Sequence, residues 1–161
     1  MLIRAFADAD WQQVWPFFDE VVAEEEVFAL PRGLTSERAL RAWVGPPPGC
    51  TVVAVEDERV LGTARAAPNL PGPGAHVATA GVVVAPHARG RGVGRALAEH
   101  VLALSREQGF LAVQVDAVVE TNAPAVALGK ALGFSIVGTV PEAFEHPVHG
   151  LVGLHVMHRR L

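Results

Sequence analysis

A glycine-rich segment with interspersed arginines is the part of this sequence best suited to binding a ligand. Residues 89–95 contain three glycines and three arginines: Arg89, Gly90, Arg91, Gly92, Gly94 and Arg95. An apolar run ends at Val84 before this segment, and a helical apolar pattern starts at Val93. Glycine lets the backbone approach a ligand without a Cβ clash, and the free N–H groups and dipole of a helix start attract anions. A strand, a glycine loop and a helix start in this order predict a pyrophosphate site.

Two common phosphate-binding patterns do not fit this segment. The dinucleotide fingerprint G-x-G-x-x-G needs a third glycine where Arg95 stands. The loop of nucleoside triphosphatases needs Gly-Lys followed by Ser or Thr, and the single lysine, Lys130, is far along the chain. The pattern present is Arg89-x-x-Gly92-x-Gly94. A plain glycine turn between a strand and a helix is the alternative interpretation.

A second segment, residues 122–134, has the features of a capped helix. Asn122 is a good N-cap and Pro124 suits the first helical turn. Gly133 suits the left-handed position that follows a helix end. The apolar residues share one helical face: Ala125, Leu128, Ala131 and Leu132.

Together the two segments resemble the acetyl-CoA-binding motifs of the GNAT family of N-acetyltransferases. Residues 89–94 are similar to the family's pyrophosphate loop, and residues 122–134 are similar to its later motif, which ends in Leu-Gly-Phe. The ending, residues 136–159, resembles a bacterial subgroup whose substrates are poorly defined. The resemblance implies one N-acetyltransferase domain, residues 1–161, with acetyl-CoA as cosubstrate and no metal.

The resemblance also implies which residues bind the cofactor. The pyrophosphate would lie on the N–H groups of residues 90–95, and the pantetheine arm would lie between strands at residues 76–85 and 111–118. The arm would pair with the main chain of Val82 and Val84, and an N–H near Val82 or Val83 would stabilise the oxyanion. The expected cofactor-binding residues are Val82, Val83, Val84, Arg89, Gly90, Arg91, Gly92, Val93, Gly94, Arg95, Asn122 and Ala125.

The resemblance implies a general acid that this chain lacks. Many family members carry a tyrosine at the position of Gly129, and this chain has no tyrosine at all. The thiol of coenzyme A has a pKa near the cysteine reference of about 8.5, so it can leave without strong assistance. We therefore expect slow but real turnover, and a wider acceptor side of the cleft at Gly129.

A general base must take a proton from the incoming amine. The main candidates are Asp116, which interrupts an apolar strand, His76, which opens the central strand, and Glu26, near the end of the first helix. Glu25 and Glu120 are further candidates. The alternative for the acidic run at residues 24–26 is a solvated surface.

Composition narrows the function classes. The formal net charge is −4 and no basic stripe with interleaved aromatics is present, which argues against nucleic-acid binding. No apolar run is long enough to span a bilayer, and the N-terminus does not have the apolar stretch of a signal peptide. The single cysteine, Cys50, fits a reducing compartment, so a cytoplasmic protein without membrane association is expected. Two histidine pairs lack a helical frame or a cysteine pair, so no metal site is expected: His146 with His149, and His155 with His158.

The apolar periodicities predict a mixed sheet of about seven strands with helices on both faces. The resemblance implies that this is the α+β, mostly antiparallel GNAT acyl-CoA N-acyltransferase fold. A helix that links the strands at 76–85 and 111–118 favours parallel pairing between them. Pro16 predicts a kink or a shifted start in the first helix, and residues 141–150 are expected to form a loop. The expected strands are residues 2–6, 51–55, 59–67, 76–85, 111–118, 134–140 and 151–160, and the expected helices reach from about 10 to 27, 36 to 44, 93 to 108 and 122 to 132.

Two functions follow as hypotheses. The first is acetyl transfer from acetyl-CoA to a primary amine of a small molecule or peptide. The alternative is a catalytically weak CoA-binding sensor or interaction module, which Gly129 favours. The resemblance is also compatible with a homodimer.

Overall fold

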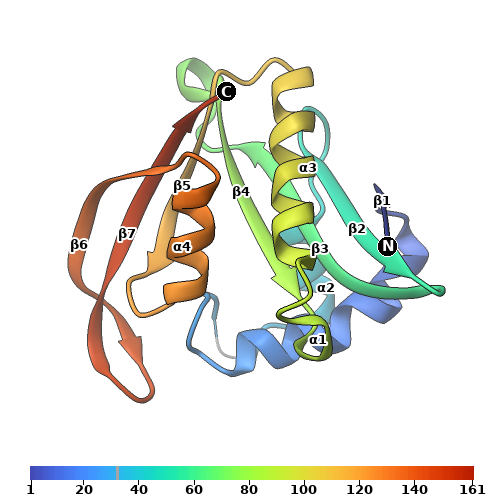
Figure 1. Cartoon of the computed structure of the whole chain (residues 1–161), viewed down its shortest axis with the longest axis horizontal. Coiled ribbons are helices and arrows are strands. Elements are labelled where there is room, and N and C mark those ends of the chain that lie inside the picture. The colour runs from blue at the N-terminus through green and yellow to red at the C-terminus, as the bar shows by residue number, and fades with distance from the viewer. Residues whose placement is uncertain (32) are drawn as a thin grey trace.

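A mixed seven-stranded sheet runs through the described part of the chain, residues 1–31 and 33–161 of a computed structural model (Figure 1). The strand order is β1-β2-β3-β4-β5-β7-β6, and all neighbours pair antiparallel except β4 and β5, which are parallel. This confirms the predicted α+β class and the predicted parallel pair. The strands are β1 (Leu2–Ala5), β2 (Cys50–Glu56), β3 (Arg59–Pro68), β4 (Val77–Val84), β5 (Ala112–Val119), β6 (Ser135–His146) and β7 (Gly150–Arg160).

Helices cover both faces of this sheet. The helix α3 (Val93–Glu107) and the helix α4 (Ala123–Ala131) lie in front of the sheet in Figure 1, whereas α1 (Trp11–Ala23) and α2 (Ser36–Trp43) lie behind it. Alternate residues of β4 face the two helical layers. On one face, a Cβ at Gly81 would meet the ring of Trp43 in α2, and on the other face Val84 lies next to Gly94 of α3. Short 3-10 turns complete the order at Asp8–Asp10, Gly72–Gly74 and Pro86–Ala88. None of the helices in the described ranges is long and apolar enough to cross a membrane.

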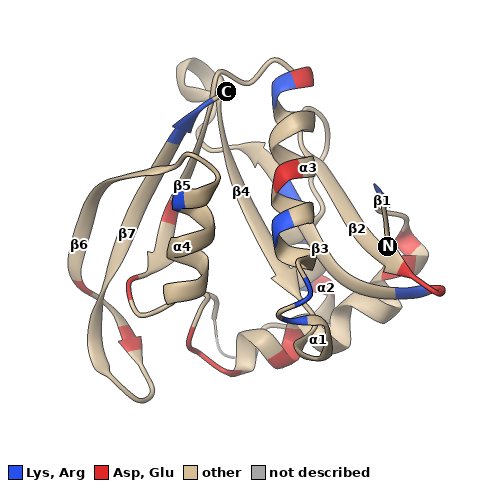
Figure 2. Cartoon of the chain, in the orientation of Figure 1, with Lys and Arg blue, Asp and Glu red and all other residues tan. Residues whose placement is uncertain are grey.

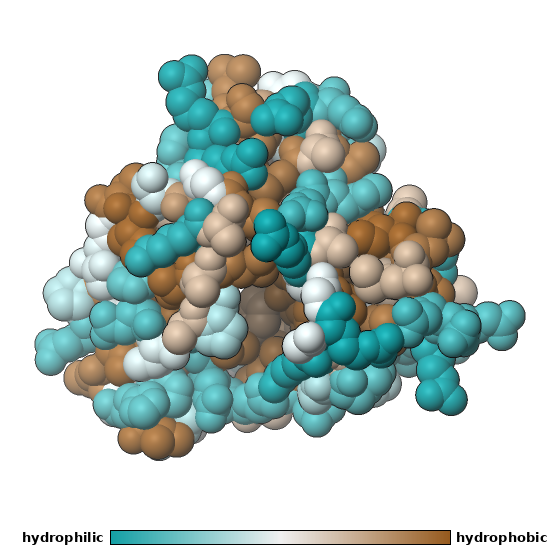
Figure 3. Space-filling model, viewed as in Figure 1, coloured by the Kyte–Doolittle hydropathy of each residue, from teal (hydrophilic) through white to brown (hydrophobic). Residues whose placement is uncertain are grey.

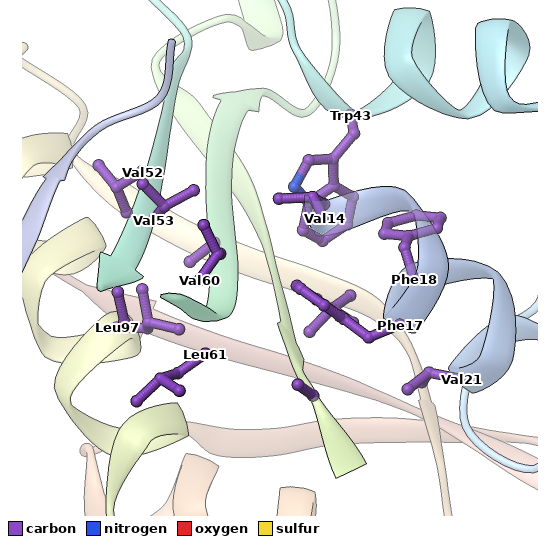
Figure 4. Close-up of a cluster of buried hydrophobic side chains, with 14 of the residues drawn as sticks. Val14, Phe17, Phe18, Val21, Trp43, Val52, Val53, Val60, Leu61 and Leu97 are labelled. Atoms are coloured by element: carbon purple, nitrogen blue, oxygen red, sulfur yellow. The ribbon is translucent and has the colours of Figure 1, made fainter. Parts of the chain in front are cut away.

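An aromatic cluster holds α1 and α2 against the sheet (Figure 4). The rings of Phe18 and Trp43 meet edge to face, with centroids 5.1 Å apart. The indole N–H of Trp43 donates to the buried hydroxyl of Thr63 at 3.0 Å, and that hydroxyl donates to the carbonyl of Val52 at 2.9 Å. The cluster therefore buries apolar area and satisfies its polar atoms as well.

The first helix ends earlier than the sequence predicts. It runs from Trp11 to Ala23 rather than to residue 27, and Glu25 adopts a left-handed φ of 55°. Three consecutive glutamates at a helix C-terminus oppose the helix dipole, which explains the early end. Pro16 lies inside the helix, and its exposed position leaves the unpaired carbonyl of the preceding turn open to water.

The expected loop at residues 141–150 is wrong. The strand β6 continues to His146, and only a tight turn separates it from β7. Pro141 is tolerated because β6 is the edge strand and its register shifts between Val140 and Phe144, where Glu142 has a φ of 52°. The prolines therefore mark an irregular edge strand, and the other elements lie within three residues of the predicted bounds.

An ion pair ties the first strand to the first helical turn. The guanidinium of Arg4 donates to both carboxylate oxygens of Asp10, each at 2.7 Å, and the N–H of Ala7 donates to the same carboxylate at 2.8 Å. The Asp10 side chain is 8% exposed. The hydrogen bonds from Arg4 hold the pKa of Asp10 below its ordinary value, although burial opposes them in part.

We expect Asp10→Asn to lower the melting temperature by about 3–6 °C at neutral pH, because a charge-assisted bidentate contact is lost. The pKa of Asp10 is lower in the folded state than in the unfolded chain. The pair therefore stabilises the fold above the unfolded-state pKa, and this stabilisation is lost as the pH falls through the folded-state value. Thermal unfolding from pH 7 to pH 2 measures both effects.

The exposed pair of Glu37 and Arg41 provides the control, and Glu37→Gln is expected to shift the melting temperature by less than about 1 °C. A difference between wild type and Asp10→Asn that stays constant down to pH 2 would contradict the assignment.

Candidate functional site

The sheet opens at its centre, where β4 and β5 separate. Within the described residues these strands share only two residue pairs, Val77 with Ala112 and Ala78 with Val113. Beyond that point β4 stays paired with β3 up to Val84, and β5 stays with β7 through a register shift between Val115 and Val118. The two halves of the sheet therefore diverge, and the β5-facing edge of β4 is left without a strand partner.

A cavity of about 570 Å³ fills this opening. The molecular face in Figure 3 is hollowed near its centre, and hydrophobic residues line the hollow. The cavity extends from the end of α1 on one side of the sheet to α3 and α4 on the other. Its wall includes Val27, Phe28, Ala80, Val82, Val83, Val84, Ala98, Val115, Ala117, Val118, Leu128 and Met157.

The glycine loop lies at the mouth of this cavity, ahead of α3. Gly90 and Gly92 have left-handed φ angles of 74° and 79°, which other residues adopt only with strain. Gly92 is the N-cap of α3 and offers no side-chain acceptor, so the N–H groups of the first turn remain available to a ligand. Gly94 needs no special φ, but a Cβ there would lie 3.3 Å from a methyl group of Val84.

Each arginine of the loop contacts a carboxylate. Arg89 meets Glu24 at 3.1 Å, Arg91 meets Glu56 at the end of β2 at 2.5 Å and Arg95 meets Glu99 one helical turn away at 2.9 Å. Figure 2 shows segments of Lys and Arg in blue in the loop ahead of α3 and along α3. The contact with Arg91 lowers the pKa of Glu56. These pairs reduce the positive field of the arginines, so the main-chain N–H groups are the better-placed donors for an anion.

The second motif forms the predicted capped helix. The side-chain oxygen of Asn122 accepts from the N–H of Ala125 at 3.2 Å, Pro124 lies in the first turn and Gly133 has a φ of 83°. Asn122 and Ala125 both line the cavity. The structure thus places the two sequence motifs on one opening.

The candidate bases lie in different places. Glu26 lines the cavity together with Glu24. Asp116 accepts from Gln114 at 2.5 Å on one face of β5, whereas its neighbours Val115 and Ala117 line the cavity.

His76 lies at the closed end of the strand pair. Its carbonyl accepts from the N–H of Leu111, and its ring contacts the carbonyl of Pro73 at 3.0 Å. The structure does not bring it to the cavity. The carboxylate of Glu120 binds the backbone of β7, because it accepts a hydrogen bond from the N–H of Gly153 at 2.5 Å.

The space beside Gly129 is occupied. A Cβ at this position would lie 2.8 Å from the terminal methyl of Met157, whose side chain is 2% exposed. Gly129 thus makes room for the Met157 thioether, which corrects the expectation of a wider acceptor side. No ionisable side chain replaces the missing tyrosine at this position.

One lining residue was missed by the sequence analysis. His146, considered only as half of a histidine pair, lies at the end of β6, is 7% exposed and faces the cavity. It was missed because residues 141–150 were expected to be a surface loop.

Two other sequence features can be compared with the structure. Within the described residues no group of three or more His, Cys, Asp or Glu side chains could hold a metal ion. The thiol of Cys50 is free and half-buried, and burial raises its pKa.

Known proteins share this arrangement. The family model described as "Acetyltransferase (GNAT) family" matches residues 11–134, and the chain therefore belongs to the GNAT family. A GCN5-related N-acetyltransferase from Kribbella flavida, of known structure, is 53% identical in sequence to this chain. The superposition covers 99% of this chain and 97% of that one, with a TM-score of 0.97.

Two more distant relatives are also similar to this chain, one in its structure and one in its sequence. A GNAT superfamily phosphinothricin acetyltransferase from Sinorhizobium meliloti, solved in complex with acetyl-CoA, is 23% identical, covers 99% of this chain and 88% of that one, and has a TM-score of 0.88. The N-acetyltransferase aca1 of Schizosaccharomyces pombe is 29% identical over 99 residues, or 61% of this chain. The match spans 47% of that curated relative's length.

We expect Gly129→Ala to leave the free energy of unfolding unchanged or lower, although alanine favours a helix over glycine by about 1 kcal/mol. The added methyl meets the end of Met157 and offsets this gain. In a Met157→Val background, where the long side chain is absent, Gly129→Ala should raise the free energy of unfolding by about 0.5–1 kcal/mol. Urea unfolding of the four proteins measures this coupling, and equal effects in both backgrounds would refute the contact.

Proposed function

We propose that the protein is an N-acetyltransferase that moves acetyl from acetyl-CoA to a primary amine of a small molecule or peptide. The supporting observation is the opening between β4 and β5, which meets the glycine loop at its mouth. Membership of the GNAT family agrees with this reading.

The residues present fit acetyl-CoA, which would supply the activated acetyl thioester. The N–H groups from Gly90 to Arg95 would bind the diphosphate, because two left-handed glycines turn the loop and no side chain caps α3. Val82 and Val84 would offer main-chain groups and an apolar wall to the pantetheine arm, with Asn122 and Ala125 across the cavity. The N–H of Val82 would stabilise the oxyanion, whereas the N–H of Val83 points to β3 like that of Ala85.

The acceptor would enter from the side where α1 ends. Glu24 and Glu26 line the cavity there beside Val27 and Phe28, so this end combines negative charge with an apolar wall. Carboxylates favour a protonated amine before reaction. We assign the general base to Glu26, because Glu24 is already paired with Arg89.

A CoA-binding module with weak catalysis is the second candidate. The absence of a side chain at Gly129 favours it, because Met157 fills the space beside this position and supplies no hydroxyl that could act as an acid. Release of free thiol from acetyl-CoA in the presence of amines separates the two functions. A cytoplasmic location and a homodimer stay predictions from the sequence.

We expect Gly92→Glu to weaken CoA binding about 100-fold, since a carboxylate would stand beside the diphosphate. Gly109→Glu is a matched control: Gly109 also has a left-handed φ, 87°, follows the other end of α3 and has open space around its Cβ. Both variants should lose similar stability, but only Gly92→Glu should lose CoA affinity by calorimetry. Equal affinity of the two variants would refute the proposed diphosphate site.

We expect Glu26→Gln to lower kcat about 100-fold, because the base is lost. Asp116→Asn and His76→Gln test the other candidates and should keep kcat within about threefold, a change too small for loss of a base. Steady-state thiol release from pH 5 to pH 9 measures all three. A larger loss in Asp116→Asn would assign the base to Asp116 instead.

A further inference from the structure

His146 is a buried polar side chain of the cavity to which the mechanism above gives no role. It is 7% exposed, lines the cavity and ends β6 just before the tight turn to β7. Its ring lies 4.6 Å from that of His149 and 6.4 Å from that of Phe144, measured between centroids. The imidazole is thus held between the hairpin and the cavity.

The hydrogen bonds of the ring define its tautomer. The N–H groups of Val148 and His149 donate to Nδ1 at 3.1 and 3.2 Å. Nδ1 therefore carries the lone pair, and the ring proton is on Nε2. Because the lone pair of Nδ1 is already engaged, the group that the ring can offer to a ligand is the Nε2–H donor.

Nε2 is the ring nitrogen without a protein partner. Within the described ranges, no fully buried side-chain nitrogen or oxygen lacks a hydrogen-bond partner. Nε2 has no partner among the hydrogen bonds of the ring, so it retains exposed surface, and His146 is one of the residues that border the cavity. The Nε2–H group is therefore a donor that is oriented before any ligand binds.

The other polar side chains of the cavity complement this donor. Glu26 is an acceptor that favours a cation, Arg89 is paired with Glu24 and Asn122 caps α4. Thr121 adds a hydroxyl, which carries no charge. A carboxylate on the ligand would meet repulsion from Glu26, whereas a neutral oxygen would not.

We propose that His146 is a specificity-determining residue that selects amines carrying a neutral oxygen, such as an amide carbonyl, by donating a hydrogen bond from Nε2. This inference rests on the proposed acetyl transfer. Small amino amides and peptide N-termini share the required chemistry, a protonatable amine and an amide oxygen in one molecule.

Two substitutions separate the two ring nitrogens. The side-chain oxygen of His146→Asn can stand near the Nδ1 position and accept from the turn, but nothing replaces Nε2. The side-chain amide of His146→Gln reaches the Nε2 position and restores a donor there. A purely structural role would need only the Nδ1 acceptor.

The test uses three amines with acetyl-CoA: glycinamide, glycylglycinamide and ethylamine, which has no oxygen. The ratio of kcat/KM in His146→Asn to that in wild type cancels the intrinsic reactivity of each amine. We expect it to fall about tenfold for glycinamide, the size of one hydrogen bond, and to stay within about twofold of unity for ethylamine. A similar fall for glycylglycinamide identifies peptide N-termini as acceptors, and a fall for glycinamide alone restricts the class to small amides. His146→Gln should recover part of the loss.

An equal loss for ethylamine and glycinamide, or no loss for either, overturns the proposal, and so does an unfolding midpoint that falls in parallel with activity. Calorimetry of the same amines with CoA-loaded protein separates this proposal from the proposed function. His146-dependent preference for glycinamide without thiol release would support the role of His146 and refute acetyl transfer. Thiol release without such a preference would support acetyl transfer and refute the role of His146.

Discussion

The short parallel contact between β4 and β5 is the constraint on which the rest of the molecule depends. Two residue pairs, ending at Ala78 and Val113, hold the two halves of the sheet together at one end. After them the backbone of β4 has a strand partner on one side only. An exposed strand edge is normally paired or covered. Here it borders a cavity whose apolar walls suit a long, thin ligand arm that can hydrogen-bond to a strand.

The other elements maintain this separation. On one side β3 pairs with β4 along its length, and the aromatic cluster around Phe18 and Trp43 fixes α1 behind it. On the other side β7 pairs with β5 through a shifted register. The helices α3 and α4 cover the front, and each begins at the mouth of the opening with the cap that its motif predicts. The family's two motifs are therefore the two helix starts that face the opening.

The sequence predicted what depends on local chemistry and missed what depends on distant packing. Asn122, Pro124 and Gly133 predict a capped helix because caps act within one turn. The end of α1 and the length of β6 were wrong because they depend on tertiary pairing and on the dipole of a whole helix. Pro141 indicated a loop, but at a sheet edge beside a register shift the missing N–H costs little. His146 could be found only once β6 was known to continue past Pro141.

The C-terminal hairpin shapes the part of the cavity that the two motifs do not. Met157 of β7 fills the space that Gly129 leaves, and His146 of β6 borders the same cavity. Both side chains come from strands that lie beyond the family match, which ends at residue 134. The motifs on α3 and α4 thus suit a ligand that many relatives share, while the hairpin adds one polar and one apolar side chain to the cavity wall. A chain can keep the first half of the site and change the second by exchanging side chains on two strands, because the hairpin forms its own pairs independently of the glycine loop.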